Sequence, residues 1–338
     1  MKTDSIEDLP SPCFVCEEQL LEKNLQLLEY VNQQSDVKIL LALKGYALWS
    51  TFDVCKQYLH GCCASGLHEA RLAKEEFGKE VHTYSPAFKE EEIDEIIKIS
   101  NHVVFNSFNQ WNTFKSKAIG KTSCGLRINP EVSSVDVDLY NPCGKHSRLG
   151  ITQKEFDKHS SKKQFLEHID GFHFHALCEQ NVDVLEKVLH SFEKNFSQYF
   201  LELKWVNFGG GHHITRADYD VERLIIVLRE FKLRYPHLEV YLEPGEAVGW
   251  QTGYLLTTVL DIVHNEMDIV ILDTSAEAHM PDTLAMPYRA DIRGAGIKDE
   301  KKHTYKLTGN TCLAGDVIGD YSFDKKLEVG DKIILEDM

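Results

Sequence analysis

The sequence predicts an α/β fold: a (β/α)8, TIM-like barrel followed by a smaller, mostly β domain. Two observations lead to this prediction. Eight strand-like segments alternate with helical patterns through the first three-quarters of the 338 residues, which is the order that such a barrel requires. After residue 250 the helical patterns give way to strand-like segments separated by turns. We therefore expect the barrel over residues 11–250 and the β domain over residues 251–338, together with residues 1–10.

The eight expected barrel strands are β-branched or apolar runs that end at Gly, Pro, Asn or Ser. They cover residues 37–44, 59–66, 81–87, 102–107, 124–130, 169–177, 204–211 and 238–245. The first reads "VKILLALK", with six apolar residues in its first seven, as is typical of a parallel strand buried on both faces. A doubly wound sheet is the alternative, but it more often has a glycine-rich turn after its first strand, and none follows this one.

Composition and charge narrow the possible partners. The net charge of −16 is unfavourable for binding a phosphate backbone, so we expect no nucleic-acid partner, whereas a cationic small molecule is favoured. No run approaches the roughly 18 apolar residues of a membrane span, so no membrane partner is expected. The nine cysteines are odd in number and scattered, as is typical of reduced thiols in the cytoplasm.

Reactive residues and glycines stand at the C-terminal ends of the expected strands, where the active site of such a barrel collects. They are Lys44, Ser65, Asn106, Arg127, His175, Gly209, Gly210, Gly211 and Glu243. Lys44 follows the first strand. A lysine at this position either extends into solvent or forms a Schiff base with a carbonyl compound.

Two of these strand ends have the chemistry of a cofactor site. "NFGGGHH" places Gly209, Gly210 and Gly211 between a strand and a helix, where bare amides approach a phosphate closely. "EPGEA" places Glu243 at a strand end, where a carboxylate keeps a pyridine nitrogen protonated so that the ring withdraws electrons. The alternatives are a flexible loop for the glycines and an ordinary turn for the glutamate.

The segment "GFHFHAL" places His173 and His175 on the same face of a strand. A metal pair is one interpretation, but no third ligand follows at a characteristic spacing, and we expect no metal. A histidine stacked on a flat cofactor fits better, and buried core histidines remain an alternative. Pyridoxal phosphate requires a lysine, a phosphate site, a carboxylate and a stacking ring together, so it is the cofactor that we predict.

These motifs give the chain a family resemblance. From residue 11 to its end it resembles the fold-type III pyridoxal-phosphate decarboxylases, the group that includes ornithine and diaminopimelate decarboxylases, and most of all those acting on carboxynorspermidine and carboxyspermidine. The most specific motifs are "ALKGY", "GFHFHALCE", "NFGGGHHIT", "LEPGEA" and "GNTCLAGDVIGDY". The resemblance implies a closing segment after "ILEDM", so we expect the sequence to be incomplete at its C-terminus.

The resemblance also implies roles for individual residues. Lys44 forms the Schiff base, His175 stacks on the ring, and Glu243 holds the pyridine nitrogen. The glycines that hold the phosphate are Gly209, Gly210 and Gly211. Cys312, contributed across the interface of a head-to-tail homodimer, returns a proton to the substrate carbon after carbon dioxide departs.

Departures from the family pattern point to the substrate. Glu246 replaces the arginine that follows the Glu-Pro-Gly of ornithine decarboxylase, Cys178 replaces a serine, and Leu313 replaces the aspartate after the cysteine. An acid at position 246 attracts cations, so we expect Glu246 and Asp282 to bind the distal amines of a polyamine. The other candidate acids are Asp273, Glu277 and Asp316.

The predicted activity is decarboxylation of carboxyspermidine or carboxynorspermidine to spermidine or norspermidine in polyamine biosynthesis. The main alternative is decarboxylation of diaminopimelate or another basic amino acid. The residue pattern is also compatible with a racemase, a non-catalytic pyridoxal-phosphate protein or a metal-dependent barrel hydrolase.

Overall fold

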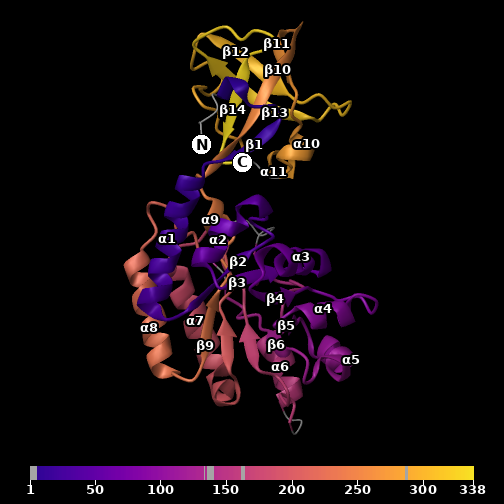
Figure 1. Ribbon diagram of the computed structural model, residues 1–338, viewed down its shortest axis with the longest axis vertical. Coiled ribbons are helices and arrows are strands. Elements are labelled where there is room, and N and C mark those ends of the chain that lie inside the picture. Colours follow the sequence, from indigo (N-terminus) through magenta and orange to yellow (C-terminus); the bar gives the residue numbers. More distant parts are fainter. Residues whose placement is uncertain (1–5, 133, 135–140, 161–163, 286–287) are drawn as a thin grey trace. The chain divides into compact units, whose positions relative to one another are not determined.

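Eight parallel strands close into a barrel in the computed structural model, which describes residues 6–132, 134, 141–160, 164–285 and 288–338 (Figure 1). The strands are β2 (Lys38–Ala42), β3 (Gly61–Ala64), β4 (Glu80–Tyr84), β5 (His102–Phe105), β6 (Ser123–Arg127), β7 (Gly171–His173), β8 (Trp205–Asn207) and β9 (Glu239–Leu242). Pairing of Lys38 with Tyr241 and of Ile39 with Leu242 joins the last strand to the first. The predicted fold class is therefore confirmed.

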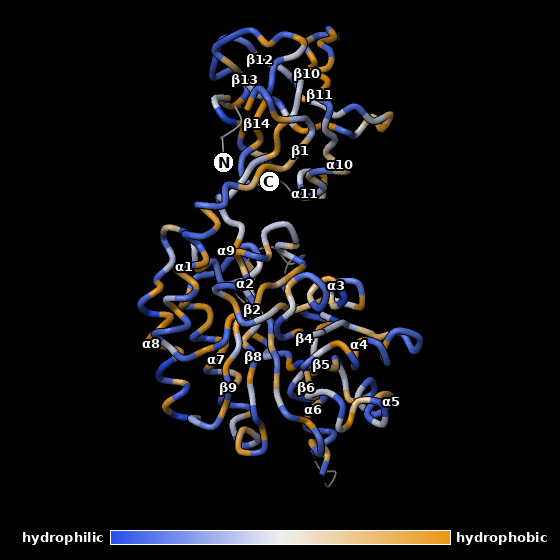
Figure 2. Tube along the Cα trace, in the orientation of Figure 1, coloured by the Kyte–Doolittle hydropathy of each residue, from blue (hydrophilic) through white to orange (hydrophobic). Residues whose placement is uncertain are grey.

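One helix precedes the first barrel strand, and the others follow the barrel strands in chain order. They are α1 (Glu18–Ser35), α2 (Phe52–Tyr58), α3 (Leu67–Leu72) with its continuation η3 (Ala73–Phe77), α4 (Ile93–Ile99), α5 (Phe108–Ala118), α6 (Gln153–Ser160), α7 (Val182–Phe196), α8 (Val221–Arg234) and α9 (Glu246–Gly249), with short 3-10 turns η1 (Ile6–Asp8), η2 (Trp49–Thr51) and η5 (Ser197–Glu202). In α8 the buried residues Leu224, Leu228 and Phe231 recur at intervals of three and four, which places them on one face of the helix. Figure 2 shows hydrophobic and hydrophilic segments along α8. Within the described chain, no helix combines the length and apolarity that crossing a membrane requires.

The N-terminal half of the barrel interior is packed with aromatic rings. The ring centroids of His82 and His102 lie 3.9 Å apart, and those of His102 and Trp205 lie 4.7 Å apart. Two glycines make room for the indole: a Cβ on Gly171 would lie 2.0 Å from Trp205 Cδ2, and one on Gly125 would lie 2.4 Å from Trp205 Cη2. The barrel is therefore closed at this end by side chains, which leaves its other end for a ligand.

Gly171→Ala is expected to lower the free energy of unfolding, because its new methyl group overlaps the buried indole of Trp205. Overpacking of this kind costs typically about 1–3 kcal/mol, occasionally more. Urea unfolding followed by circular dichroism measures the change. Gly66→Ala is the matched control, because its new Cβ meets no heavy atom within 4 Å. Equal stability of the two variants would contradict this packing.

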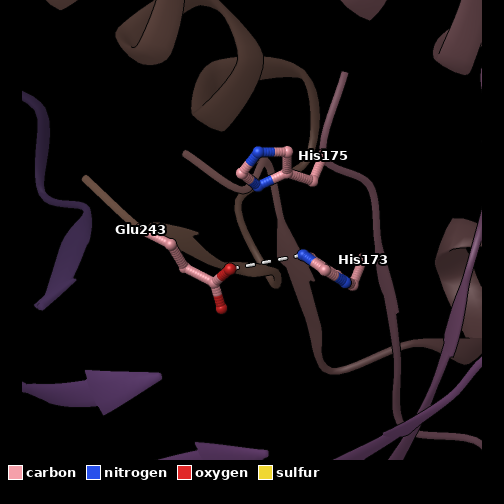
Figure 3. A group of neighbouring side chains, drawn as sticks. All are labelled: His173, His175 and Glu243. Atoms are coloured by element: carbon pink, nitrogen blue, oxygen red, sulfur yellow. Dashed lines mark ion pairs between the residues drawn. The ribbon is translucent and has the colours of Figure 1, made fainter. Parts of the chain in front are cut away.

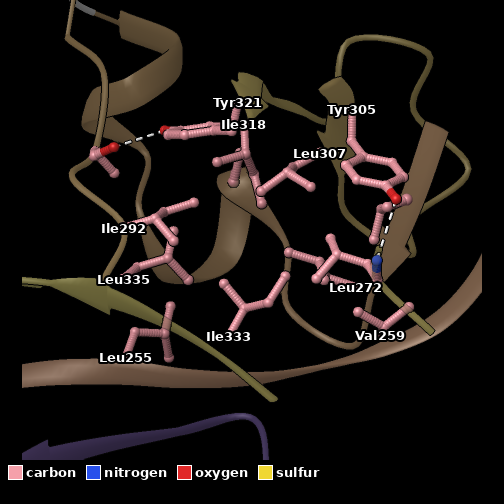
Figure 4. Close-up of a cluster of buried hydrophobic side chains, with 14 of the residues drawn as sticks. Leu255, Val259, Leu272, Ile292, Tyr305, Leu307, Ile318, Tyr321, Ile333 and Leu335 are labelled. Carbon is pink, nitrogen blue, oxygen red and sulfur yellow. Dashed lines mark hydrogen bonds between the residues drawn. The ribbon is translucent and has the colours of Figure 1, made fainter. Parts of the chain in front are cut away.

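The second unit is a six-stranded sheet with a hydrophobic core (Figure 4). Its strands run in the order β1 (Cys13–Cys16), β10 (Gly253–Asn265), β11 (Met267–Leu272), β12 (His303–Thr308) and β13 (Val317–Phe323), and β14 (Lys332–Glu336) pairs with β10. Two short helices, α10 (Ala276–His279) and α11 (Asp282–Ala285), follow β11. The Tyr321 hydroxyl donates to Ala290 O at 2.6 Å, so this buried core ring keeps its polar atom satisfied.

The chain divides at other residues than the sequence suggested. One unit comprises Met1–Leu21 and Trp250–Met338, and the other comprises Glu22–Gly249. Residues 13–16, which we assigned to the barrel, form β1, because Cys13–Cys16 pairs antiparallel with Gly253–Leu256 of β10. Of residues 1–10, which we assigned to the β domain, residues 1–5 lie outside the described chain.

Candidate active site

Lys44 lies in a tight turn two residues beyond β2. The N–H groups of Gly45 and Tyr46 both donate to Ala42 O, at 3.0 and 3.1 Å, and the Lys44 side chain is exposed. A Cβ on Gly45 would lie 3.0 Å from Glu246 N and 3.1 Å from Gly245 Cα. The glycine after the lysine therefore allows the turn to pack against the loop between β9 and α9, which brings Lys44 to the same barrel end as Glu243.

Glu243 follows β9 directly and is buried, with 8% of its surface exposed. Asn207 Nδ2 donates to its Oε1 at 2.7 Å, and His173 Nε2 lies 3.3 Å from its Oε2 (Figure 3). Burial alone would raise the pKa of this carboxyl group, but the contact with His173 and the hydrogen bond from Asn207 hold it below its ordinary value. Glu243 is therefore an ionised carboxylate at neutral pH.

The glycine loop after β8, residues 209–211, is fixed by hydrogen bonds from two of its N–H groups. The N–H of Gly209 donates to Asn207 Oδ1 at 2.8 Å, and the N–H of Gly210 donates to His175 Nδ1 at 3.1 Å. Within the described residues, the N–H of Gly211 has no hydrogen-bond acceptor. Side chains cannot be added here: a Cβ on Gly209, Gly210 or Gly211 would lie 2.4, 2.1 or 2.1 Å from a backbone oxygen. The loop thus offers a backbone donor that no protein group occupies, as an anion site requires.

His175 lies two residues beyond β7 and is half-buried. Loss of water around its ring and the positive charges of Lys44 and Arg127 hold its pKa well below the ordinary value, so the imidazole is neutral at pH 7. Because Nδ1 accepts from Gly210, the ring proton is on Nε2. Arg127 Nη2 donates to the His175 carbonyl at 3.2 Å, which fixes the backbone that carries the ring.

Two acids lie beside this loop. Glu246 begins α9 and is exposed, and its Oε1 lies 3.2 Å from Nε2 of the buried His213. Partial burial and the negative charge of Glu246 raise the pKa of Glu179, which follows Cys178 on the loop after β7. Two carboxyl groups, those of Glu179 and Glu246, therefore lie near each other beside the glycine loop.

In the sheet unit, Cys312 is exposed in a turn that Asp316 organises. Asp316 is only 3% exposed, and its carboxylate accepts from Ala276 N at 2.8 Å and from the Thr311 hydroxyl at 2.6 Å. Burial alone would raise the pKa of Asp316, but these hydrogen bonds lower it. The structure thus differs from our expectation that Asp316 binds substrate: its oxygens hold the turn that presents the thiol.

Asp273 also differs from the prediction. Its carboxylate accepts from the Thr257 hydroxyl at 2.6 Å, from Thr258 N at 2.9 Å and from the Ser11 hydroxyl at 2.6 Å. These bonds fasten the segment before β1 to β10, so this acid stabilises the sheet. Of the other acids in the segment, Glu277 on α10 and Asp282 on α11 are exposed.

Asn207 is the site residue that the sequence motifs did not reveal. Its amide bridges the Glu243 carboxylate and the first glycine of the loop, and its side chain is buried. The signal that could have found it was its position, because it is the last residue of a barrel strand and stands two residues before the glycines. The structure thus brings Lys44, His175, the glycine loop and Glu243 to one end of the barrel.

The comparisons with known proteins agree with this geometry. The family model for "Pyridoxal-dependent decarboxylase, C-terminal sheet domain" matches residues 13–338. The chain belongs to the pyridoxal-dependent decarboxylases. It is 52% identical to the carboxynorspermidine/carboxyspermidine decarboxylase of Campylobacter jejuni, over 98% of this chain and 88% of that protein. It is 45% identical to the carboxyaminopropylagmatine decarboxylase of Synechocystis, over 100% of this chain and 87% of that protein.

Two solved structures have the same fold as this decarboxylase. The carboxynorspermidine decarboxylase of Campylobacter jejuni, complexed with norspermidine, superposes with a TM-score of 0.89 at 50% identity, over 97% of this chain and 88% of that chain. The diaminopimelate decarboxylase of Helicobacter pylori superposes with a TM-score of 0.83 at 17% identity, over 98% of this chain and 86% of that chain, and shows the fold alone.

Pyridoxal phosphate is the cofactor of this decarboxylase, and the residues present fit it. The glycine loop supplies an open backbone N–H for the phosphate, and the ionised Glu243 is an acceptor for a protonated ring nitrogen. The neutral, half-buried His175 offers a flat face, and the exposed Lys44 offers an amine. His173, His175 and Glu243 also satisfy the spacing of a metal site, with ligand atoms within 4.8 Å of one another, but His175 uses Nδ1 for the glycine loop.

Proposed function

We propose that this decarboxylase converts carboxyspermidine and carboxynorspermidine to spermidine and norspermidine in polyamine biosynthesis. The observation that carries the proposal is the 52% identity, over 98% of the chain, to the Campylobacter jejuni enzyme that acts on these compounds. The acid Glu246 beside the glycine loop supports it, because a polyamine has several ammonium groups to be bound. Exposed Glu277 and Asp282 are further candidates for those groups.

Each active-site residue of the barrel has a role in the proposal. When bound, pyridoxal phosphate supplies a protonated ring that withdraws electrons from the substrate carbon. Lys44 would supply the amine that attaches the cofactor. The ionised Glu243 would accept a hydrogen bond from the ring nitrogen, and the neutral His175 would pack on the ring without adding charge.

We propose that Cys312 of the partner subunit in a homodimer returns the proton to the substrate carbon. Its exposure supports this role, because a thiol that acts in another subunit has to lie on the surface. The neighbouring Leu313 is 49% exposed, and burial of such a side chain against a second chain is favourable.

All nine cysteines are free, which is typical of a reducing compartment, so we place the dimer in the cytoplasm.

Carboxyaminopropylagmatine decarboxylation is the second candidate function. The 45% identity to the Synechocystis enzyme extends over the whole chain. This compound ends in a guanidinium group, which an exposed carboxylate binds through two parallel hydrogen bonds. The two candidates therefore require the same charge in the site and differ in the shape of the cation.

A parallel measurement of carbon dioxide release tests the proposal. The substrates are carboxynorspermidine, carboxyspermidine, carboxyaminopropylagmatine and diaminopimelate, and kcat/KM is compared among them. We expect the first two to differ by no more than about 10–200-fold, because a single methylene contributes only about 1–3 kcal/mol. Diaminopimelate is expected to react far more slowly, since its second carboxylate meets the acids of this site. A preference for diaminopimelate would overturn the proposal.

A further inference from the structure

His173 is a buried histidine that neither the fold nor the cofactor roles account for. It ends β7 inside the barrel and is 2% exposed. Nε2 lies 3.3 Å from Glu243 Oε2, which is within ion-pair distance (Figure 3). Among the described residues, neither Nε2 nor Nδ1 has a partner that meets the geometry of a hydrogen bond. Burial of an imidazole without hydrogen bonds costs free energy, so the position of this ring beside Glu243 requires an explanation.

The surroundings of His173 hold its ring in place. The Tyr84 ring lies 5.5 Å from it between centroids, and the Arg127 guanidinium lies 4.4 Å from the centroid of the Tyr84 ring. The Tyr84 hydroxyl donates to Asn106 Oδ1 at 2.8 Å, so the tyrosine itself is fixed. The imidazole is thus packed as firmly as a core residue, while Nε2 is directed at a carboxylate.

The charge state of His173 follows from the same surroundings. Burial lowers its pKa, although Glu243 acts in the opposite direction, and the nearby Arg127 lowers it further. A neutral imidazole has one N–H, and contact with an ionised carboxylate places this proton on Nε2. Nδ1 is then an acceptor. A neutral donor orients Glu243 without cancelling its negative charge, which remains available to a protonated ring nitrogen.

Each oxygen of Glu243 has a polar neighbour. Asn207 donates to Oε1 at 2.7 Å, and His173 lies at Oε2. A carboxylate has about four lone-pair positions, so two contacts leave room for a further donor. The hydrogen bond from Asn207 restrains rotation of the carboxylate. A hydrogen bond from His173 Nε2 to Oε2, which are 3.3 Å apart, would restrain it further.

We infer that His173 is a positioning residue that donates its Nε2–H to Glu243 and, with Asn207, directs the carboxylate at the ring nitrogen of the cofactor. The inference rests on the proposed role of Glu243 and assigns a new role to a residue that the sequence left between core packing and metal ligation. His173 acts on the cofactor only through Glu243.

The first test determines the tautomer of the ring. Protein labelled with ¹⁵N-histidine, in its cofactor-bound form, reports the tautomer of each imidazole by long-range ¹H–¹⁵N correlation. His173→Gln identifies the resonances of His173. We expect a neutral Nε2–H tautomer for His173 through the neutral pH range. An Nδ1–H tautomer, a protonated ring, or stoichiometric zinc or iron in the purified protein would overturn the inference.

The second test compares His173→Phe with His173→Gln. Phenylalanine retains a ring without a donor, whereas glutamine retains an N–H donor near the position of Nε2. Each variant is loaded with pyridoxal phosphate labelled with ¹⁵N in the ring, whose chemical shift reports protonation of that nitrogen. We expect His173→Phe to lose the protonated signal and bind the cofactor about tenfold more weakly or worse, the effect of one hydrogen bond to a charged group. His173→Gln should retain both properties to within about threefold.

Glu243→Gln separates the inference from the function on which it rests. In one outcome, Glu243→Gln loses the protonated signal, whereas His173→Phe keeps both this signal and the full affinity for pyridoxal phosphate. Glu243 then acts as proposed, and the role inferred for His173 is wrong. If Glu243→Gln also keeps the signal, the role of Glu243 is wrong and the inference fails with it. A purely structural role of His173 would lower the free energy of unfolding of both His173 variants equally and leave the ring signal protonated, which also overturns the inference.

Discussion

Lys44→Ala is expected to abolish covalent attachment of pyridoxal phosphate and to reduce decarboxylation by at least the contribution of one positioned proton-transfer group, about 10²–10⁴-fold. The physical reason is that alanine supplies no amine at the barrel end where the glycine loop and Glu243 meet. Reduction with borohydride followed by mass spectrometry of the peptide containing residue 44 measures attachment, and carbon dioxide release measures turnover.

Two controls make the Lys44 result specific. Lys44→Arg keeps the positive charge near His175 but cannot attach the cofactor, so it should lose attachment as Lys44→Ala does. Lys74→Ala removes another exposed lysine of the barrel unit and should leave attachment and turnover unchanged. Modification of a different lysine, or normal turnover by Lys44→Ala, would show that the assignment of Lys44 is wrong.

Gly210→Ala is expected to lower cofactor affinity and to reduce kcat/KM by about 10²-fold, the cost of misplacing a site by about 1 Å. The new Cβ would lie 2.1 Å from the Glu243 carbonyl oxygen, and ordinary contacts begin near 3.4 Å. The glycine loop must therefore retreat from the end of β9, which displaces the phosphate site and the carboxylate together. Titration with pyridoxal phosphate, followed by absorbance, measures the affinity.

Two control measurements show whether Gly210→Ala changes only the cofactor site or unfolds the protein. Gly66→Ala, whose Cβ meets open space, should bind the cofactor as the unchanged protein does. Circular dichroism and urea unfolding of the cofactor-free proteins should show that Gly210→Ala is folded. Unchanged affinity in Gly210→Ala would contradict the close approach of the glycine loop to β9.

The sequence predicted the barrel because buried parallel strands leave a continuous apolar run, as in residues 37–44. It also predicted which residues meet at the site, since the carboxyl ends of all barrel strands lie at one end. Lys44, His175, the glycine loop and Glu243 could be named on that rule before their positions were known. Their roles in cofactor chemistry came from the residue types and from resemblance to the family, and they stay predictions until the experiments above are done.

The sequence could not predict which polar side chains stabilise the fold and which are left for a ligand. Asp273 and Asp316 looked like substrate acids, but their hydrogen-bond donors, Thr257 and Ala276, lie on other elements. Residues 13–16 were wrongly assigned to the barrel, because β1 pairs with β10, more than 230 residues later in the chain, and local periodicity contains no information about such pairing.

The sequence by itself determined the barrel, the residues at its strand ends and the family, because these depend on local periodicity and on short motifs. Only the tertiary structure decided how those residues are held. The bridge from Asn207 to Glu243 and the contact of His173 with the same carboxylate join residues 36 and 70 positions apart. Hydrogen bonds and ion pairs depend on distance in space, and that distance is fixed only when the eight strands close.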